Sequence, residues 1–105
     1  MRRGEIWWAE LPLPTGRRPV VLLSRDSAYH VRTSITVGAI TRTVRDIPVE
    51  VPLDKNDGMP QNCVINLDEI LTIPKARLVE RITTLSPQKM ALIAKAIAFA
   101  LDLKF

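Results

Sequence analysis

A chain of 105 residues with 47% hydrophobic and 25% charged residues has the composition of one globular domain, which excludes an intrinsically disordered protein. A single cysteine, Cys63, and a single histidine, His30, exclude a disulfide framework and a zinc site built from the usual ligands. The net charge is +4 and ten of the fifteen basic residues are arginines, which favours a polyanionic partner because a guanidinium group matches phosphate geometry.

The sequence contains no run of 18 apolar residues, so it predicts no membrane span. Residues 1–4 are not followed by an apolar region typical of a signal peptide. We find no internal repeat and no linker. We therefore expect one domain over residues 1–105, in a cytoplasmic protein without membrane contact.

The first predicted strand covers residues 4–11, which are rich in aromatic and branched side chains and end at a proline. Trp7 and Trp8 are neighbours, so they face opposite sides of the sheet. We expect one indole in the core. The other either covers a subunit interface or offers a surface on which a nucleobase could stack.

Two adjacent arginines, Arg17 and Arg18, precede the unbroken apolar run of the second predicted strand, residues 18–24. A fixed cationic pair on the rim of a buried strand suits a phosphate-binding site. A polar loop is expected over residues 25–32. It contains His30, whose usual pKa would allow a role as general acid or base, although a solvated surface position is the simpler interpretation.

Residues 33–43 alternate apolar and polar side chains and predict a strand with one solvated or site-facing side, formed by Ser34, Thr36 and Gly38. This strand ends at Ile40-Thr41-Arg42-Thr43, where hydroxyls and a guanidinium lie together. Residues 47–53 predict a strand with two prolines, which places it at an edge of the sheet or at a bulge.

Beyond the turn at residues 54–60, residues 63–73 predict one or two strands, and residues 78–85 predict the last strand. Ser86-Pro87 begins a helix to about Leu101, because serine caps free amides and proline fits the first turn. The helix is apolar on two sides, so we expect it to pack on its own sheet and on another subunit or a partner. This order predicts an α+β protein with a strongly bent antiparallel sheet, or small barrel, and a C-terminal helix.

Seven motifs occur together along the chain: Arg3-Gly4-Glu5-Ile6-Trp7-Trp8, Gly16-Arg17-Arg18-Pro19-Val20, Ala39-Ile40-Thr41-Arg42-Thr43, Val51-Pro52-Leu53, Asp57-Gly58-Met59-Pro60, Asp68-Glu69-Ile70-Leu71-Thr72-Ile73 and Leu85-Ser86-Pro87-Gln88-Lys89-Met90. In this order they resemble the MazF/PemK/Kid toxin family over nearly the whole chain. The resemblance implies an SH3-like barrel and a homodimer. It also implies a metal-independent, ribosome-independent endoribonuclease that cuts single-stranded RNA at a short sequence and needs no cofactor. A cognate antitoxin would neutralise it by placing a disordered tail in the RNA groove.

The resemblance assigns catalysis to Arg18 and Thr41, and implies attack by the 2′-OH that leaves a 2′,3′-cyclic phosphate and a 5′-OH. Arg18 could hold two phosphate oxygens, and Thr41 could donate to a non-bridging oxygen. Because arginine stays protonated in proteins, we expect Arg18 to stabilise charge and not to act as the base, and a role as proton donor stays open. Asp68, His30 and a water molecule remain open as the base.

Further candidates surround these two residues. Ser24 is a candidate for support of the catalytic site, and the expected RNA-binding residues are Arg17, Arg42, Thr43, Arg45 and Asn66. Asn66 stands where some members of the resembled family carry an arginine.

Two alternative functions remain. One is a gyrase-poisoning toxin of the same fold, but that class depends on a tryptophan near the C-terminus, and this chain ends Asp102-Leu103-Lys104-Phe105. The other is a nucleic-acid-binding barrel without catalysis, which would have no need of the Arg18 and Thr41 pair.

Overall fold

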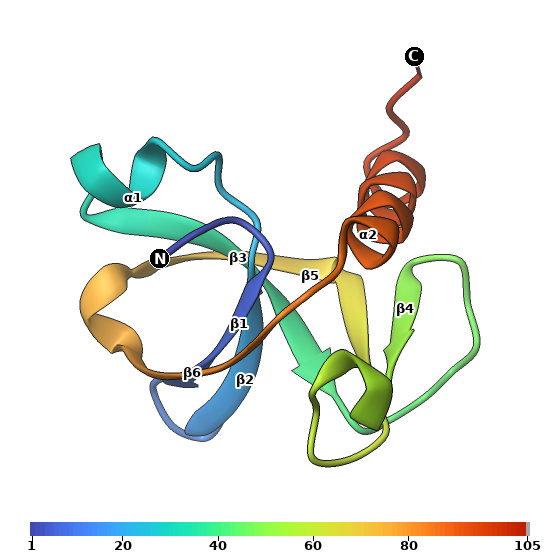
Figure 1. The fold of residues 1–105 in the computed structure, drawn as a ribbon, viewed down its shortest axis with the longest axis horizontal. Helices are drawn as coiled ribbons and strands as arrows, with labels where there is room; N and C mark the ends of the chain where they lie inside the picture. The colour runs from blue at the N-terminus through green and yellow to red at the C-terminus, as the bar shows by residue number, and fades with distance from the viewer. Residues whose placement is uncertain (105) are drawn as a thin grey trace.

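The computed structural model describes residues 1–104, in which one curled antiparallel sheet carries a long helix near the C-terminus (Figure 1). The elements in chain order are β1 (Glu5–Glu10), β2 (Arg17–Leu22), α1 (Ala28–Val31), β3 (Ser34–Thr41), β4 (Glu50–Leu53), the 3₁₀ turn η1 (Lys55–Asp57), β5 (Cys63–Pro74), the 3₁₀ turn η2 (Lys75–Arg77), β6 (Leu78–Thr84) and α2 (Pro87–Ala100). The predicted α+β architecture is confirmed. No helix in this part of the chain is long and apolar enough to cross a membrane.

The six strands form one sheet in the order β4-β5-β3-β2-β1-β6, curled into a half-barrel. β4 lies at an edge, as its prolines predict. β5 is one continuous strand that bends sharply: its register against β3 shifts between the pairs Gly38↔Ile70 and Ala39↔Asn66. Such a bulge increases local twist, so this bend contributes to the curl of the sheet.

The two edges of the sheet meet through the segment that follows β4. The Thr83 hydroxyl on β6 donates to the Asp57 carbonyl of η1 at 3.0 Å. Gly58 ends η1 with φ of 90°, and a Cβ atom there would lie 2.3 Å from Thr83 Oγ1. Glycine is therefore required at position 58 both by its backbone conformation and by the close approach of β6.

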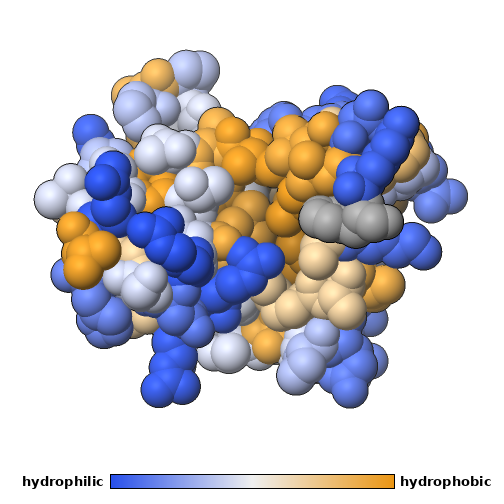
Figure 2. Space-filling view, turned by 90° about the horizontal axis from the view of Figure 1, so that it is seen from above, coloured by the Kyte–Doolittle hydropathy of each residue, from blue (hydrophilic) through white to orange (hydrophobic). Residues whose placement is uncertain are grey.

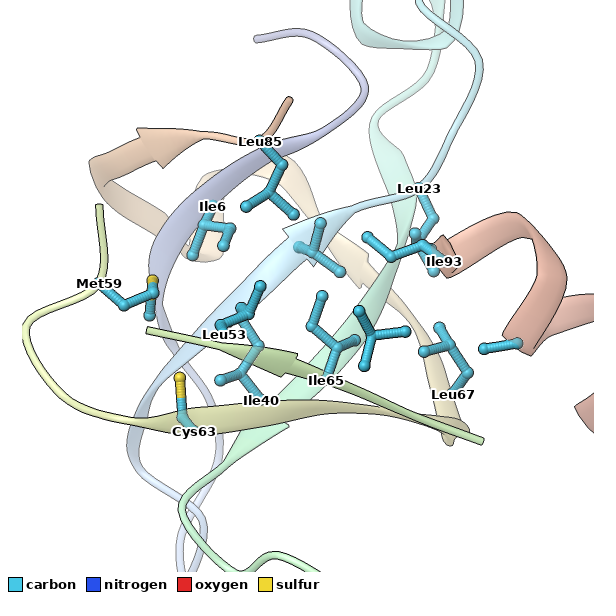
Figure 3. Close-up of a cluster of buried hydrophobic side chains, with 13 residues drawn as sticks. Ile6, Leu23, Ile40, Leu53, Met59, Cys63, Ile65, Leu67, Leu85 and Ile93 are labelled. Carbon is cyan, nitrogen blue, oxygen red and sulfur yellow. The ribbon is translucent and has the colours of Figure 1, made fainter. Parts of the chain in front are cut away.

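Apolar side chains form two clusters on opposite faces of β2. Val21 belongs to the cluster enclosed by the curled sheet and α2, and Val20 and Leu22 belong to the other. Figure 3 shows the enclosed cluster, with Met59 and Cys63 at the end away from Ile93 of α2. Alternating side chains in β2 are buried on both sides, which explains its unbroken apolar sequence.

Gly38 corrects one prediction about β3. Residue 38 is buried, and a Cβ atom there would lie 3.1 Å from Val21 Cγ1 and 3.3 Å from Ile65 Cγ2. The side of β3 that was expected to be solvated or site-facing instead enters the enclosed core at Gly38. Ser34 and Thr36 on the same side are partly exposed, as predicted, so only Gly38 departs from the expectation, because β2 and β5 pack closely there.

Residues 25–32 are also more ordered than the predicted loop, because they contain the four-residue helix α1. The Tyr29 hydroxyl donates to the Ser24 carbonyl at 3.0 Å, and Lys75 Nζ donates to the Tyr29 carbonyl at 2.8 Å. Tyr29 is buried, and burial raises its pKa to about 12. Contacts with η2, distant in sequence, hold this helix.

The predicted start of α2 is confirmed: Ser86 Oγ accepts a hydrogen bond from the Lys89 amide at 3.1 Å. The helix ends at Ala100, one residue before its predicted end. Ile93 and Ala96 are its buried residues, and they pack on the enclosed core. Leu92, Phe99 and Leu103 of the second predicted apolar side stay exposed, and so does Leu101 at the end of the first.

Candidate functional site

A cleft of about 620 Å³ opens where β2 begins and β3 ends, at the end of the enclosed core where Met59 and Cys63 lie. Strands β1, β2 and β3 form one wall, and the segment after η1 forms the other. The lining residues are Trp8, Arg17, Arg18, Pro19, Ile40, Thr41, Arg42, Thr43, Met59, Pro60, Gln61 and Cys63.

Arg18 and Thr41 share this cleft because their strands are antiparallel neighbours. The register pairs Val20 with Ala39, so Arg18 and Thr41 lie opposite each other two residues further along. Residues opposite each other across an antiparallel pair project from the same face. Both side chains are half-buried and line the cleft. The arrangement directs a guanidinium and a hydroxyl to one region.

Arg17 projects to the other face of β2 and covers an aromatic ring. Its guanidinium carbon lies 5.2 Å from the centroid of the Trp8 indole. Its Nη1 also donates to Glu10 Oε1 at 3.0 Å, and both side chains of this ion pair are about half exposed, at 48% and 49%. The register explains the contact, because Arg17 pairs with Glu10, and Trp8 lies two residues before Glu10 on the same face.

The opposite wall comes from residues that the sequence did not single out as functional. Arg42 Nη1 donates to Gln61 Oε1 at 2.7 Å, which joins the end of β3 to the segment after η1. Thr43 donates its amide to Thr41 Oγ1 at 3.2 Å. Met59, Pro60 and Gln61 reach the cleft only because η1 packs against β6, and no local sequence pattern signals that contact.

The cleft is positively charged. Arg17, Arg18 and Arg42 line it, and within residues 1–104 no carboxylate or imidazole does. Burial, with Asp57 nearby, raises the pKa of the Cys63 thiol, so the sulfur stays protonated at neutral pH and is a poor nucleophile. No group of three or more potential metal-ligating side chains gathers anywhere in the described chain.

The structure does not bring Ser24 or His30 to this cleft. Ser24 follows the far end of β2, six residues from Arg18, which corresponds to about 20 Å of extended strand. Its Oγ accepts the Thr36 amide at 2.8 Å, so its hydroxyl organises the β2–α1 connection. His30 is exposed on α1, which follows the same far end of β2.

Three further candidates also lie outside the cleft lining. Asn66 is 5% exposed, and its Oδ1 accepts the Asp68 amide at 3.0 Å within the β5 bend. Asp68 itself is exposed. Arg45 is exposed in the β3–β4 loop, where its backbone amide donates to Glu50 Oε1 at 2.9 Å. The site therefore gathers Arg17, Arg18, Thr41, Arg42 and Thr43 from the predicted set.

Several known proteins are similar to this chain. Residues 2–101 match the family of PemK-like, MazF-like toxins of type II toxin–antitoxin systems. The probable endoribonuclease MazF5 of Mycobacterium tuberculosis is 39% identical over 101 residues, which cover 95% of this chain and 92% of that protein. The solved structure of the M. tuberculosis toxin MazF-mt6 has a TM-score of 0.89 at 36% identity, covering 96% of this chain and 99% of its own.

A mycobacterial endoribonuclease solved in complex with its cognate antitoxin also has a TM-score of 0.89, at 26% identity, covering 100% of this chain and 98% of its own. The match extends over nearly the full length, and includes both the strands that carry the cleft and the C-terminal helix. The chain belongs to the PemK-like, MazF-like family of type II toxin–antitoxin toxins.

Proposed function

We propose that this protein is the toxin of a type II toxin–antitoxin pair, and that it acts as a metal-independent, sequence-specific endoribonuclease on single-stranded RNA in the cytoplasm. The observation that carries the proposal is the half-buried pair Arg18 and Thr41, which faces a cleft lined by two more arginines. The name of the relative MazF5, a probable endoribonuclease, supports the same activity.

The residue types at the cleft suit transesterification of RNA. Attack of the 2′-OH on the adjacent phosphorus forms the new P–O bond, and the P–O5′ bond breaks. The products are a 2′,3′-cyclic phosphate and a 5′-OH. Arg18 stabilises the phosphorane by contacting two of its oxygens, and the Thr41 hydroxyl donates to a non-bridging oxygen. Since the substrate itself supplies the nucleophile, RNA reacts and DNA does not.

We assign the proton transfers largely to water. The described residues that line the cleft include no carboxylate or imidazole. A guanidinium group is not a base in proteins. Water therefore takes the proton of the 2′-OH. Solvent supplies the proton that the leaving 5′ oxygen takes up, and the Arg18 guanidinium can donate a hydrogen bond to that oxygen without losing its own proton. On this assignment Asp68 and His30 have no part in proton transfer.

The antitoxin is proposed to occupy the same cleft. A disordered acidic segment would pair with Arg17, Arg18 and Arg42 and would exclude RNA by competition. The solved complex of a mycobacterial relative with its cognate antitoxin supports a partner of this kind.

The first experiment tests cleavage directly. Purified protein should cut a long single-stranded RNA at discrete positions in excess EDTA, and end analysis should give a 2′,3′-cyclic phosphate and a 5′-OH. A matched all-deoxy strand should remain intact, because it lacks the nucleophile. Inhibition by EDTA would overturn metal independence, and cleavage of the deoxy strand would overturn the 2′-OH mechanism.

We also propose a homodimer that uses α2. Leu92, Phe99 and Leu101 are at least half exposed, at 50%, 62% and 56%. An apolar groove of about 310 Å³ runs between α2 and β4, lined in part by Pro52, Leu92 and Phe99. Figure 2 looks onto the face where the C-terminal end of α2 lies, and shows hydrophobic side chains gathered across it. An exposed apolar area of this kind favours contact between copies.

Phe99→Glu should shift the protein from dimer to monomer in sedimentation velocity at micromolar concentration, because the substitution places a charge in an apolar interface. Leu13→Glu is the matched control: Leu13 is 87% exposed at the tip of the β1–β2 loop, so this variant should remain dimeric. A Phe99→Glu variant that sediments like the wild type would exclude α2 from the interface.

A further inference from the structure

Trp8 has no role in the chemistry described above, although it lines the same cleft as Arg18 and Thr41. Trp7, its neighbour, is fixed on the other face: it packs against the second core cluster, and its Nε1 donates to Glu5 Oε1 at 2.9 Å. Within residues 1–104 no partner is found for the Trp8 indole N–H. The two tryptophans therefore differ: Trp7 packs in the core and makes a hydrogen bond there, whereas Trp8 lines the cleft.

We propose that Trp8 is a nucleobase-binding residue, and that Arg17 is a removable cover over its ring. The proposal rests on the RNA-cleaving function given above. A base next to the scissile phosphate would stack on the indole and take the place that the Arg17 guanidinium occupies in the free protein. The observation behind it is the Arg17 guanidinium carbon 5.2 Å from the ring centroid, so a planar group is already accommodated over this indole, and both residues line the cleft.

The contacts that hold Arg17 in place are weak ones. Its ion pair with Glu10 joins two side chains that are about half exposed, so water and salt screen it. The Trp8 ring is half-buried, and Arg17, the cation over it, is itself exposed, so this cation–π contact is modest, whereas stacking of a base on an indole contributes as much or more. A base can therefore displace Arg17 at little cost.

The displaced guanidinium has a second partner within the same complex. RNA brings a phosphate for every base, and an arginine released from Trp8 can bind it bidentately. The exchange replaces one cation–π contact and one exposed ion pair with a stacked base and a charge-assisted phosphate contact. Arg17 thus moves from ring to phosphate when RNA binds, while Arg18 stays on the strand and faces the reaction.

The position of Trp8 supports stacking close to the cut. Trp8 pairs with Pro19 across β1 and β2, and Pro19 directly follows Arg18. The indole and the Arg18 side chain lie on opposite faces of the sheet at its rim, so RNA that wraps the rim could place a phosphate at Arg18 and a neighbouring base on Trp8. Stacking tolerates any base, so Trp8 contributes affinity and position more than sequence choice.

Tryptophan fluorescence can measure the environment of Trp8 separately from that of Trp7. In a Trp7→Phe variant Trp8 is the remaining tryptophan, and its emission should be quenched by a fully 2′-O-methylated RNA oligonucleotide that spans a mapped cut site and cannot be cleaved. In the matched Trp8→Phe variant only Trp7 emits, and the same oligonucleotide should leave its emission nearly unchanged. Equal quenching in both variants would overturn the proposal. The proposal would also fail if Trp7→Phe showed no quenching while fluorescence anisotropy of a labelled oligonucleotide showed that RNA binds.

A second experiment measures the affinity of the protein for RNA. Trp8→Ala should weaken binding of the methylated oligonucleotide roughly 10- to 100-fold, while Trp8→Phe, which keeps an aromatic face, should recover most of the loss. Wild-type affinity in Trp8→Ala, in a protein that still cuts RNA in EDTA, would refute the stacking role and leave the proposed function intact. Loss of RNA cleavage by the wild type itself would instead refute the proposed function.

Discussion

Replacing Arg18 with alanine is expected to lower the single-turnover rate of RNA cleavage about 1,000-fold without unfolding the protein. The side chain is half-buried at the rim of β2, where surrounding protein displaces part of the water that would otherwise screen its charge. Truncation leaves the backbone pairing of Arg18 with Ala9 in place. Single-turnover cleavage of a labelled RNA measures the rate, and thermal unfolding checks the fold.

Two control variants separate this effect from a loss of net charge. Arg25→Ala removes the same charge from an exposed position beyond the far end of β2, and should cleave at close to the wild-type rate. Arg18→Lys keeps the charge but offers no bidentate fork, so it should recover only part of the rate. An Arg18→Ala variant with full activity would refute the proposed mechanism.

Thr41 should act together with Arg18 and not independently of it. If both groups stabilise the same phosphorane, the double variant Arg18→Ala/Thr41→Val should lose little more activity than Arg18→Ala alone, because groups that act as a unit are not additive. Fully multiplicative losses would indicate that Thr41 serves a separate step.

The sheet and the main helix could be predicted because their signals are local. The apolar run of β2, the prolines of β4 and the Ser86 cap of α2 each act within a few residues, and the structure confirms all three. Helix α1 was missed because its four residues are held by Lys75 and Ser24, and not by helix propensity. Gly38 was misinterpreted because a glycine in a strand can mean either exposure or close packing.

The residues that line the candidate site come together for a similar reason. Arg18 and Thr41 lie on neighbouring antiparallel strands, so motif position and strand pairing bring them together. Ser24 lies away from the cleft because six residues of extended chain separate it from Arg18. The wall formed by Met59 and Gln61 depends on the contact between η1 and β6, which joins residues 57 and 83 and leaves no pattern in the sequence.

Gly58→Ala is expected to destabilise the protein by about 3 kcal/mol, through left-handed backbone strain and overpacking against β6. Residue 58 has φ of 90°, and the new Cβ would lie 2.3 Å from Thr83 Oγ1 and 2.8 Å from Thr83 Cβ. Because Thr83 lies in a paired strand, β6 can yield only by disturbing its pairing with β1. Thermal unfolding at fixed protein concentration should show a Tm lowered by roughly 10–20 °C.

Gly16→Ala provides the matched control, because residue 16 also has positive φ, 65°, yet a Cβ there would meet only Leu13 Cδ2 at 3.9 Å. Gly16→Ala should therefore lower the free energy of unfolding only by the backbone strain, about 1–2 kcal/mol. The difference in the free energy of unfolding between the two variants then measures the contact of η1 with β6. Equal losses of stability in Gly58→Ala and Gly16→Ala would mean that β6 moves away from the new Cβ at residue 58 without a cost in free energy. Since η1 leads into Met59, Pro60 and Gln61, the displacement in Gly58→Ala should also weaken RNA binding below the unfolding temperature. A single contact between η1 and β6 would then account both for closing the half-barrel and for placing the second wall of the cleft opposite Arg18.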